Sequence, residues 1–224
     1  MKAINFVGGQ VEDTLKMLPA GARDQIDTAA RRALEISYDT ANRAQGRYAA
    51  GDGTHKVIGA ISGALGGLGG LPTALAELPV ATTVIFRAVQ GVAAQYGEDP
   101  TSTETRIECL AVFGSGGPGA DDDGVDTSFF GARIGLTGAA VHGLIGKVAP
   151  KFATVLSQKL ATQAVPILGA AAGAGTNYAF TDYYVQMAHV HFSLRKLARD
   201  HGETAVLDEF HTVLAARDVP VKTA

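Results

Sequence analysis

The sequence predicts an all-α fold, a compact multi-helix domain in which glycine- and alanine-rich helices pack closely. Apolar residues recur at intervals of three or four, which is the helical period, and no sustained alternation of apolar and polar residues indicates a strand. The 224 residues are 46% hydrophobic and 18% charged, with a mean hydropathy of +0.13, so the composition lies at the apolar end for soluble proteins. A chain of this length can bury a substantial core as one domain, residues 1–224.

The first predicted helix is amphipathic. An apolar face runs from Ile26 through Ala30 and Leu34 to Ser37 at helical spacing, and the charged residues of this segment lie largely off it. The helix is predicted to end near Tyr48, before a turn-rich Gly-Asp-Gly sequence.

Two further helices are marked by their end signals. Proline is typical of a helical first turn, so the proline at 79 predicts a helix over 79–96, and Gly97 is suited to the left-handed position that follows it. Residues 101–104 have a capping-box pattern, Thr-Ser-Thr-Glu, which predicts another helix through Phe113.

Residues 114–127 are predicted to form an acidic, glycine-rich loop, because they contain five glycines, one proline and four aspartates. Beyond this loop, helical spacing predicts helices over 129–146, 150–162, 167–197 and 204–215, of which the third can be broken.

Three weakly charged segments, 57–76, 134–146 and 160–180, raise the question of membrane insertion. The first and third approach the roughly 20 residues that a spanning helix needs. They are interrupted by Pro72 and Pro166, however, and Gly-x-x-x-Gly spacings within these segments let helical backbones approach closely in soluble cores too. We therefore expect these segments to be buried helices.

The charge and cysteine content exclude several classes of function. A net charge of −3 argues against a large nucleic-acid surface, which needs clustered positive charge. The single cysteine, Cys109, excludes an intrachain disulfide and a zinc site built on several thiolates, and its apolar surroundings predict a buried, inert thiol. Residues 1–10 lack the apolar core of a signal peptide, so a cytoplasmic location is expected.

Known ligand-binding motifs are met only in part. Residues 114–119 satisfy G-x-G-x-x-G, but a predicted helix rather than a strand precedes them, and the aspartates at 121–123 would repel phosphate. Aligned to a calcium-binding loop, the segment has Gly119 and Phe130 where carboxylates are needed. The sequence also lacks the zinc-peptidase, serine-hydrolase and P-loop patterns. We expect no cofactor and no metal.

Two stretches resemble the EcsC protein family. The first begins with ISGALGGLGGLP at 61–72 and continues to the Tyr-Gly-Glu-Asp-Pro turn at 96–100, and the second is the Gly/Ala-rich run at 166–181, which ends in the distinctive TNYAFT and continues to Phe192. With the spacer, the resemblance covers about residues 55–200. It implies a bacterial protein with a link to transport or to the membrane, and it carries over no catalytic residue.

The predicted helix over 176–199 contains the polar side chains that best fit a site. At about 100° per residue, most of them form one stripe, and the other two form a second stripe about 120–140° round the helix. The candidates are Asn177, Thr181, Tyr184, His191 and Arg195 on the first stripe and Asp182 and His189 on the second. The stripe can line a polar cleft in which Asp182 orients His189 as a general base. In the other interpretation, the tyrosine and histidine are buried with satisfied hydrogen bonds and Arg195 is solvated.

These observations favour an EcsC-like accessory protein without enzymatic activity. We expect it to associate with a membrane, or with a membrane-bound and transport-related partner, at the inner face of the membrane. One alternative is a hydrolase that uses the polar cleft on the helix at 176–199, and another is a binder of a hydrophobic small molecule. The sequence leaves the oligomeric state, the ligand and the question of enzymatic activity open.

Overall fold

The computed structural model of the chain describes residues 21–43, 70–117, 125–126, 138–163, 169–216 and 221–222. These residues form six helices and one pair of two-residue strands, so the predicted all-α fold is confirmed. The elements are α3 (Ala22–Arg43), α5 (Gly70–Gln95), α6 (Thr103–Val112), β1 (Val125–Asp126), α7 (Gly138–Gln163), α8 (Gly169–His201), α9 (Glu203–Ala216) and β2 (Val221–Lys222).

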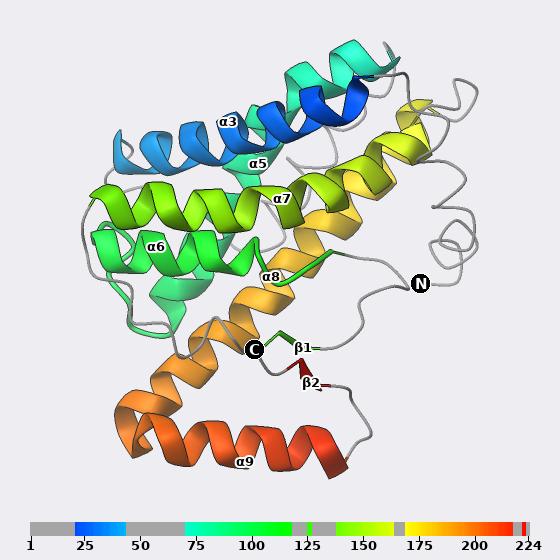
Figure 1. The fold of residues 1–224 in the computed structure, drawn as a ribbon. Helices are drawn as coiled ribbons and strands as arrows, with labels where there is room; N and C mark the ends of the chain where they lie inside the picture. Colours follow the sequence, from blue (N-terminus) through cyan, green and yellow to red (C-terminus); the bar gives the residue numbers. More distant parts are fainter. Residues whose placement is uncertain are drawn as a thin grey trace.

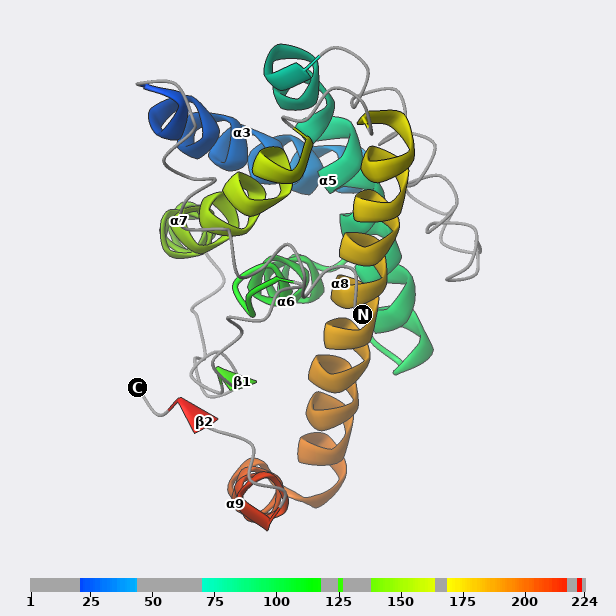
Figure 2. The same ribbon diagram turned by 90° about the vertical axis from the view of Figure 1, so that its right-hand side faces the viewer.

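Five of the helices form a bundle of two layers. Helices α3, α7 and α6 lie roughly side by side in one layer, and α5 and α8 cross behind them in the other (Figures 1 and 2). The largest contacts join α3 to α5 and to α7, and α5 to α8. Helix α9 lies outside the bundle, below the end of α8 (Figure 1).

The buried face of α3 is the one predicted from its spacing. Ile26, Ala30, Leu34 and Ser37 are all fully buried. The described helix ends at Arg43, and the predicted extension to residue 48 lies outside the described residues.

Proline 79 lies inside α5 and not in its first turn, so the predicted start of this helix was wrong. Proline has no N–H group, and the carbonyl four residues earlier therefore loses its usual helical partner. Packing offsets this loss, because Leu78 is buried and Leu75 packs against the same core. The Thr83 hydroxyl also donates a 2.7 Å hydrogen bond to the Pro79 carbonyl.

Helix α7 runs without a break through Gly146 and Pro150, so the predicted separation of two helices at this point was also wrong. Val148 and Phe152, on either side of the proline, are both buried, and their packing holds the segment helical. Helix α8 is likewise continuous from Gly169 to His201.

The turn between α5 and α6 confirms the predicted role of Gly97. Its φ is +81°, its N–H donates to the Ala94 carbonyl, and the Glu98 N–H donates to the Ala93 carbonyl, both at 3.1 Å. These two bonds are those of the Schellman motif, which satisfies carbonyls at a helix end.

The cap of α6 lies one residue later than the predicted capping box. Ser102 is the N-cap, and its hydroxyl accepts a 3.1 Å hydrogen bond from the Thr105 N–H. Just before it, Asp99 accepts hydrogen bonds from the Thr101 hydroxyl and N–H, which lower the pKa of this exposed carboxyl, the hydroxyl contributing most.

An aromatic cluster forms the centre of the core. The Phe113 ring centroid lies 4.9 Å from that of Tyr184, 5.3 Å from that of Phe152 and 6.1 Å from that of Phe86, and all four residues are buried. Cys109 is fully buried on α6, as predicted.

Small residues contribute to the core through alanine more than through glycine in the described helices. Ala30, Ala88 and Ala188 are buried. At Gly143 and Gly146 an added Cβ would meet nothing within 4 Å, so no close contact depends on these glycines. The Gly-x-x-x-Gly spacings before residue 70 and at 131–135 lie outside the described residues.

Beyond the bundle the chain turns at Gly202, whose φ is +92°, and continues into α9. No residue of α9 is buried. Val125 and Asp126 of β1 pair in parallel with Val221 and Lys222 of β2, so the two strands join the predicted loop to the end of the chain. Of that loop, residues 118–124 and 127 lie outside the described residues.

Candidate functional site

The N-terminal part of the predicted stripe on α8 is hydrogen-bonded within the protein. The Asn177 amide donates to Oε1 of Glu77 at 2.7 Å, and the Thr181 hydroxyl donates to the Asn177 carbonyl at 2.8 Å. The Tyr184 hydroxyl donates to the Gly116 carbonyl at 3.0 Å. All three side chains are buried, and the bonds of Asn177 and Tyr184 connect α8 to α5 and to the segment that follows α6.

The C-terminal part of the stripe contacts three glutamates. His191 Nε2 lies 2.8 Å from Oε2 of Glu108. Arg195 donates from Nη1 to Glu108 at 2.7 Å, from Nη2 to Glu104 at 3.0 Å and from Nε to Glu98 at 3.2 Å. Since the three glutamates lie on α6 and the turn before it, the Arg195 guanidinium links α8 to that segment.

Arg199 extends this ion-pair network by one turn of α8. Its Nη1 pairs with Glu98, and its Nη2 donates to the Tyr96 carbonyl at 2.8 Å. Burial alone lowers the pKa of Arg195, but Glu108 and Glu98, with hydrogen bonds to Glu104, more than offset this and raise it. Arg195 therefore holds its positive charge more firmly than an ordinary arginine does.

The second stripe has other contacts than the predicted pairing of Asp182 with His189. Asp182 accepts a 2.6 Å hydrogen bond from the Gln186 amide. The Nδ1 atom of His189 lies 3.2 Å from the Tyr96 hydroxyl, and the two rings meet edge to face at 5.8 Å. Each contact is one that a structural side chain would make.

The polar groups of the stripe therefore form hydrogen bonds and ion pairs with other residues of the protein. This arrangement favours the interpretation in which Tyr184 and His191 are buried with satisfied hydrogen bonds. Arg195, however, is not simply solvated, because its side chain is only 24% exposed and contacts three carboxylates. Among the described residues, no group of three or more histidine, cysteine or carboxylate side chains is placed to hold a metal ion.

The Cys109 thiol lies beside the ion-pair network. Burial raises its pKa well above the ordinary value, and the nearby charges of Glu108 and Glu98 raise it further. A thiol that stays protonated is a poor nucleophile, which agrees with the inert role predicted for it.

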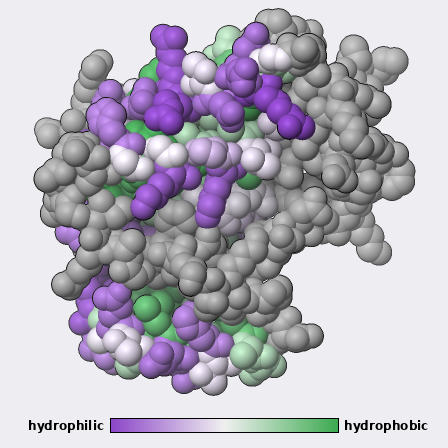
Figure 3. Space-filling model, in the orientation of Figure 1, coloured by the Kyte–Doolittle hydropathy of each residue, from purple (hydrophilic) through white to green (hydrophobic). Residues whose placement is uncertain are grey.

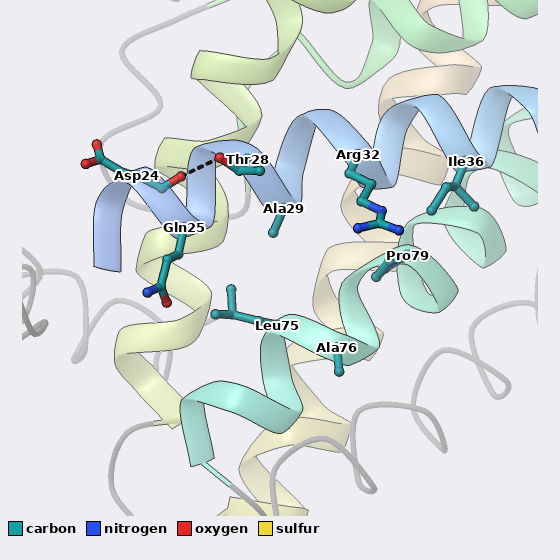
Figure 4. Close-up of a pocket in the computed structure, with 9 residues that line it drawn as sticks. All are labelled: Asp24, Gln25, Thr28, Ala29, Arg32, Ile36, Leu75, Ala76 and Pro79. Carbon is teal, nitrogen blue, oxygen red and sulfur yellow. Dashed lines mark hydrogen bonds between the residues drawn. The ribbon is translucent and has the colours of Figure 1, made fainter. Parts of the chain in front are cut away.

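A groove that the sequence did not reveal lies between α3 and the start of α5 (Figure 4). It has a volume of about 670 Å³. Its walls are mostly apolar, with polar side chains along the α3 edge. The lining residues are Asp24, Gln25, Thr28, Ala29, Arg32, Ile36, Leu75, Ala76 and Pro79.

The polar side chains of the groove differ in where they point and in whether they are hydrogen-bonded. The Arg32 guanidinium extends from α3 over the groove toward Pro79, whereas the Asp24 carboxylate points away from it (Figure 4). The Thr28 hydroxyl is occupied by a 2.8 Å hydrogen bond to the Asp24 carbonyl. Within the part of the chain that the structure describes, the Arg32 side chain forms no hydrogen bond or ion pair.

Large apolar side chains reach solvent in the groove and next to it. The lining residue Ile36 on α3 is 36% exposed, and Val80, which follows the lining residue Pro79 on α5 without itself lining the groove, is 58% exposed. A signal was present in the sequence, because Ile36 lies off the apolar face defined by Ile26 and Leu34. The groove was missed because helical periodicity shows which face of one helix is buried, not how two helices meet.

One described segment, Leu75–Gln95 of α5, is long and apolar enough to cross a membrane when judged by length and composition. Its mean hydropathy is 1.2 over the relevant window, and half of that window is buried against the other helices. A core helix passes the same test, so this observation alone is weak evidence for a span.

Comparison with known proteins identifies a family for the first half of the chain. The sequence model described as the EcsC protein family matches residues 12–120. This match includes the first of the two resembling stretches and all the residues that line the groove, whereas the second stretch and the α8 stripe lie outside it. No curated protein and no solved structure gives a significant match.

Proposed function

We propose, from the premise that this chain belongs to the EcsC protein family through residues 12–120, that it is an accessory protein without enzymatic activity. In this proposal it associates with a membrane, or with a membrane-bound partner, from the cytoplasmic side. The contact is made by the groove between α3 and α5 and by the apolar side chains around it.

The observation that carries the proposal is the exposure of apolar side chains at an open groove. Complete burial of a valine or isoleucine side chain contributes about 1.5–3 kcal/mol, so covering the exposed parts of Val80 and Ile36 is worth about 1 kcal/mol each. An apolar, concave surface of this kind is typical of an interaction site. The groove also lies wholly within the segment that matches the family.

The contacts of the α8 stripe support a role without catalysis. A hydrolase that used Asn177, His191 or Arg195 would first have to release these side chains from Glu77 and from the glutamates of the ion-pair network. Asn177 and His191 are only 3% and 5% exposed, which leaves little room for a substrate.

Flotation with phospholipid vesicles, together with fractionation of cells that produce the protein, tests the proposal. We expect the protein to float with the vesicles or to sediment with the membrane fraction. Val80→Asp should abolish both, because it puts a charge where the apolar contact forms. Val213→Asp is the matched control, since Val213 is 39% exposed on α9, away from the groove.

A protein that neither floats nor sediments with membranes would contradict the proposal. Equal loss of association in the Val80 and Val213 variants would show that the groove is not the contact surface.

A second candidate function uses the same groove to bind a hydrophobic small molecule. Its volume of about 670 Å³ lies within the roughly 300–1,000 Å³ of small-molecule sites. Mass spectrometry of a solvent extract of the purified protein would reveal such a molecule, and an extract without one would favour the membrane contact.

A further inference from the structure

Arg32 differs from the arginines of the ion-pair network in having a charge without a protein partner. Arg195 and Arg199 contact glutamates, and Arg106 donates hydrogen bonds to Ser102 and Thr103. Arg32 makes no such contact in the described part of the chain, although its guanidinium extends over an apolar groove (Figure 4). A guanidinium in this position is free to bind an anion by two parallel hydrogen bonds.

The rest of the groove suits an aliphatic chain. Ala29, Leu75 and Ala76 supply apolar walls, and the one carboxylate among the lining residues, that of Asp24, points away (Figure 4). Along α3, the stretch from Gln25 to Ile36 rises about 16 Å, which accommodates an extended chain of medium length. An uncharged ligand would leave the guanidinium unused, and a small anion would leave the apolar walls exposed.

We infer that the groove binds a single-chain anionic lipid, with its chain along the apolar walls and its carboxylate or phosphate head on Arg32. The inference rests on the proposed function and names the ligand class of the same groove. Its recognition combines a charge-assisted hydrogen bond with burial of apolar surface. Both parts of the ligand are therefore needed for tight binding.

Arg31 provides a matched control for Arg32. Both arginines are exposed on α3 and neither has an ion pair among the described residues, but only Arg32 lines the groove. A general attraction of anionic lipid to the charge of α3 would involve both arginines equally. Binding in the groove depends on Arg32 alone.

Titration calorimetry of the full chain with dodecanoate, below its micelle concentration, tests the inference. We expect one molecule to bind per chain, dodecyl phosphate to bind similarly, and acetate not to bind. Dodecan-1-ol, which has the chain without the charge, should bind about tenfold more weakly, as expected for the loss of one charge-assisted contact.

Three variants locate the site. Arg32→Gln should weaken dodecanoate binding about tenfold and leave dodecan-1-ol binding unchanged, whereas Arg31→Gln should change neither. Ala76→Trp, at an exposed position on the groove wall, should abolish binding of both by filling the groove. Equal melting temperatures without ligand would establish that the variants fold.

Several molecules of dodecanoate bound per chain, equal affinity in the Arg31 and Arg32 variants, or undiminished binding to Ala76→Trp would each overturn the inference. Stronger binding of dodecyl phosphate than of dodecanoate would identify the head group as phosphate, and the reverse as carboxylate. If dodecanoate fails to bind while the protein still floats with vesicles in a Val80-dependent manner, this inference fails and the proposed function stands. If dodecanoate binds but no membrane association is found, the proposed function fails instead.

Discussion

The five-helix bundle and α9 are both helical, yet only the bundle has a core. The bundle buries an aromatic cluster around Phe113, and its last buried residue along the chain is Leu194. In α9 no residue is buried, and hydrophobic side chains reach the surface over this helix (Figure 3). The difference shows that an apolar stripe becomes core only when several helices converge on it.

The largest loss of stability is expected from a substitution at the centre of the bundle. Phe113→Ala removes a fully buried ring that touches three other aromatic rings, and we expect it to lower the free energy of unfolding by about 4 kcal/mol. Chemical denaturation followed by circular dichroism measures this change. The same substitution at Phe210, which is half-exposed on α9, should cost about 1 kcal/mol at most, and equal losses would show that α9 shares the core.

The ion-pair network should give the next largest effect. Arg195→Ala leaves Glu98, Glu104 and Glu108 without their shared counter-charge, and we expect a loss of about 2 kcal/mol. The value is reduced from that of a fully buried pair because the arginine side chain is 24% exposed. Arg199→Ala, at a position 45% exposed, should cost less in the same denaturation experiment, and a larger loss there would contradict the central place of Arg195.

Two glycines with similar backbone geometry, one in the bundle and one before α9, separate the stability of the bundle from that of α9. Gly97 and Gly202 have φ values of +81° and +92°, and an added Cβ at either would meet nothing within 4 Å. Alanine should therefore cost about 1 kcal/mol at each position, from backbone strain alone.

The consequences of these two substitutions should nevertheless differ. Gly97→Ala, inside the bundle, should lower global stability, whereas Gly202→Ala should accelerate hydrogen exchange only in α9. Uniform acceleration throughout the bundle in Gly202→Ala would mean that α9 unfolds together with it.

The smallest effect is expected on the outer surface of α9. Val213 is 39% exposed, so Val213→Ser should change the free energy of unfolding by no more than about 0.5 kcal/mol. Val89→Ser, at a fully buried position of α5, is the matched substitution and should cost several times more. A large effect at Val213 in the denaturation experiment would reveal a contact for α9 that the structure does not contain.

Sequence patterns predicted the parts of this fold that depend on local chemistry. The buried face of α3, the left-handed Gly97 and the near-complete extent of α9 follow from helical period, chirality and end signals. The start of α5 and the continuity of α7 were not predicted, because Pro79 and Pro150 signal a local cost that tertiary packing offsets.

The candidate site was predicted less well, for a related reason. The stripe on α8 was found from helical geometry, but its partners Glu98, Glu104 and Glu108 were not, although glutamates and arginines spaced four residues apart suggest complementary faces. Which charged faces meet depends on the packing of helices far apart in the sequence. The groove depends on the same packing, since its walls come from α3 and α5.

Because Cys109 is buried, its reaction with a thiol reagent can report how often the helices of the bundle separate. Because it is the sole thiol and lies on α6 within the bundle, a thiol reagent can react only in molecules whose helices have separated. Fraying of α9 would leave the thiol covered and so escape detection. The rate of labelling therefore measures how often the interior becomes accessible, without any engineered probe.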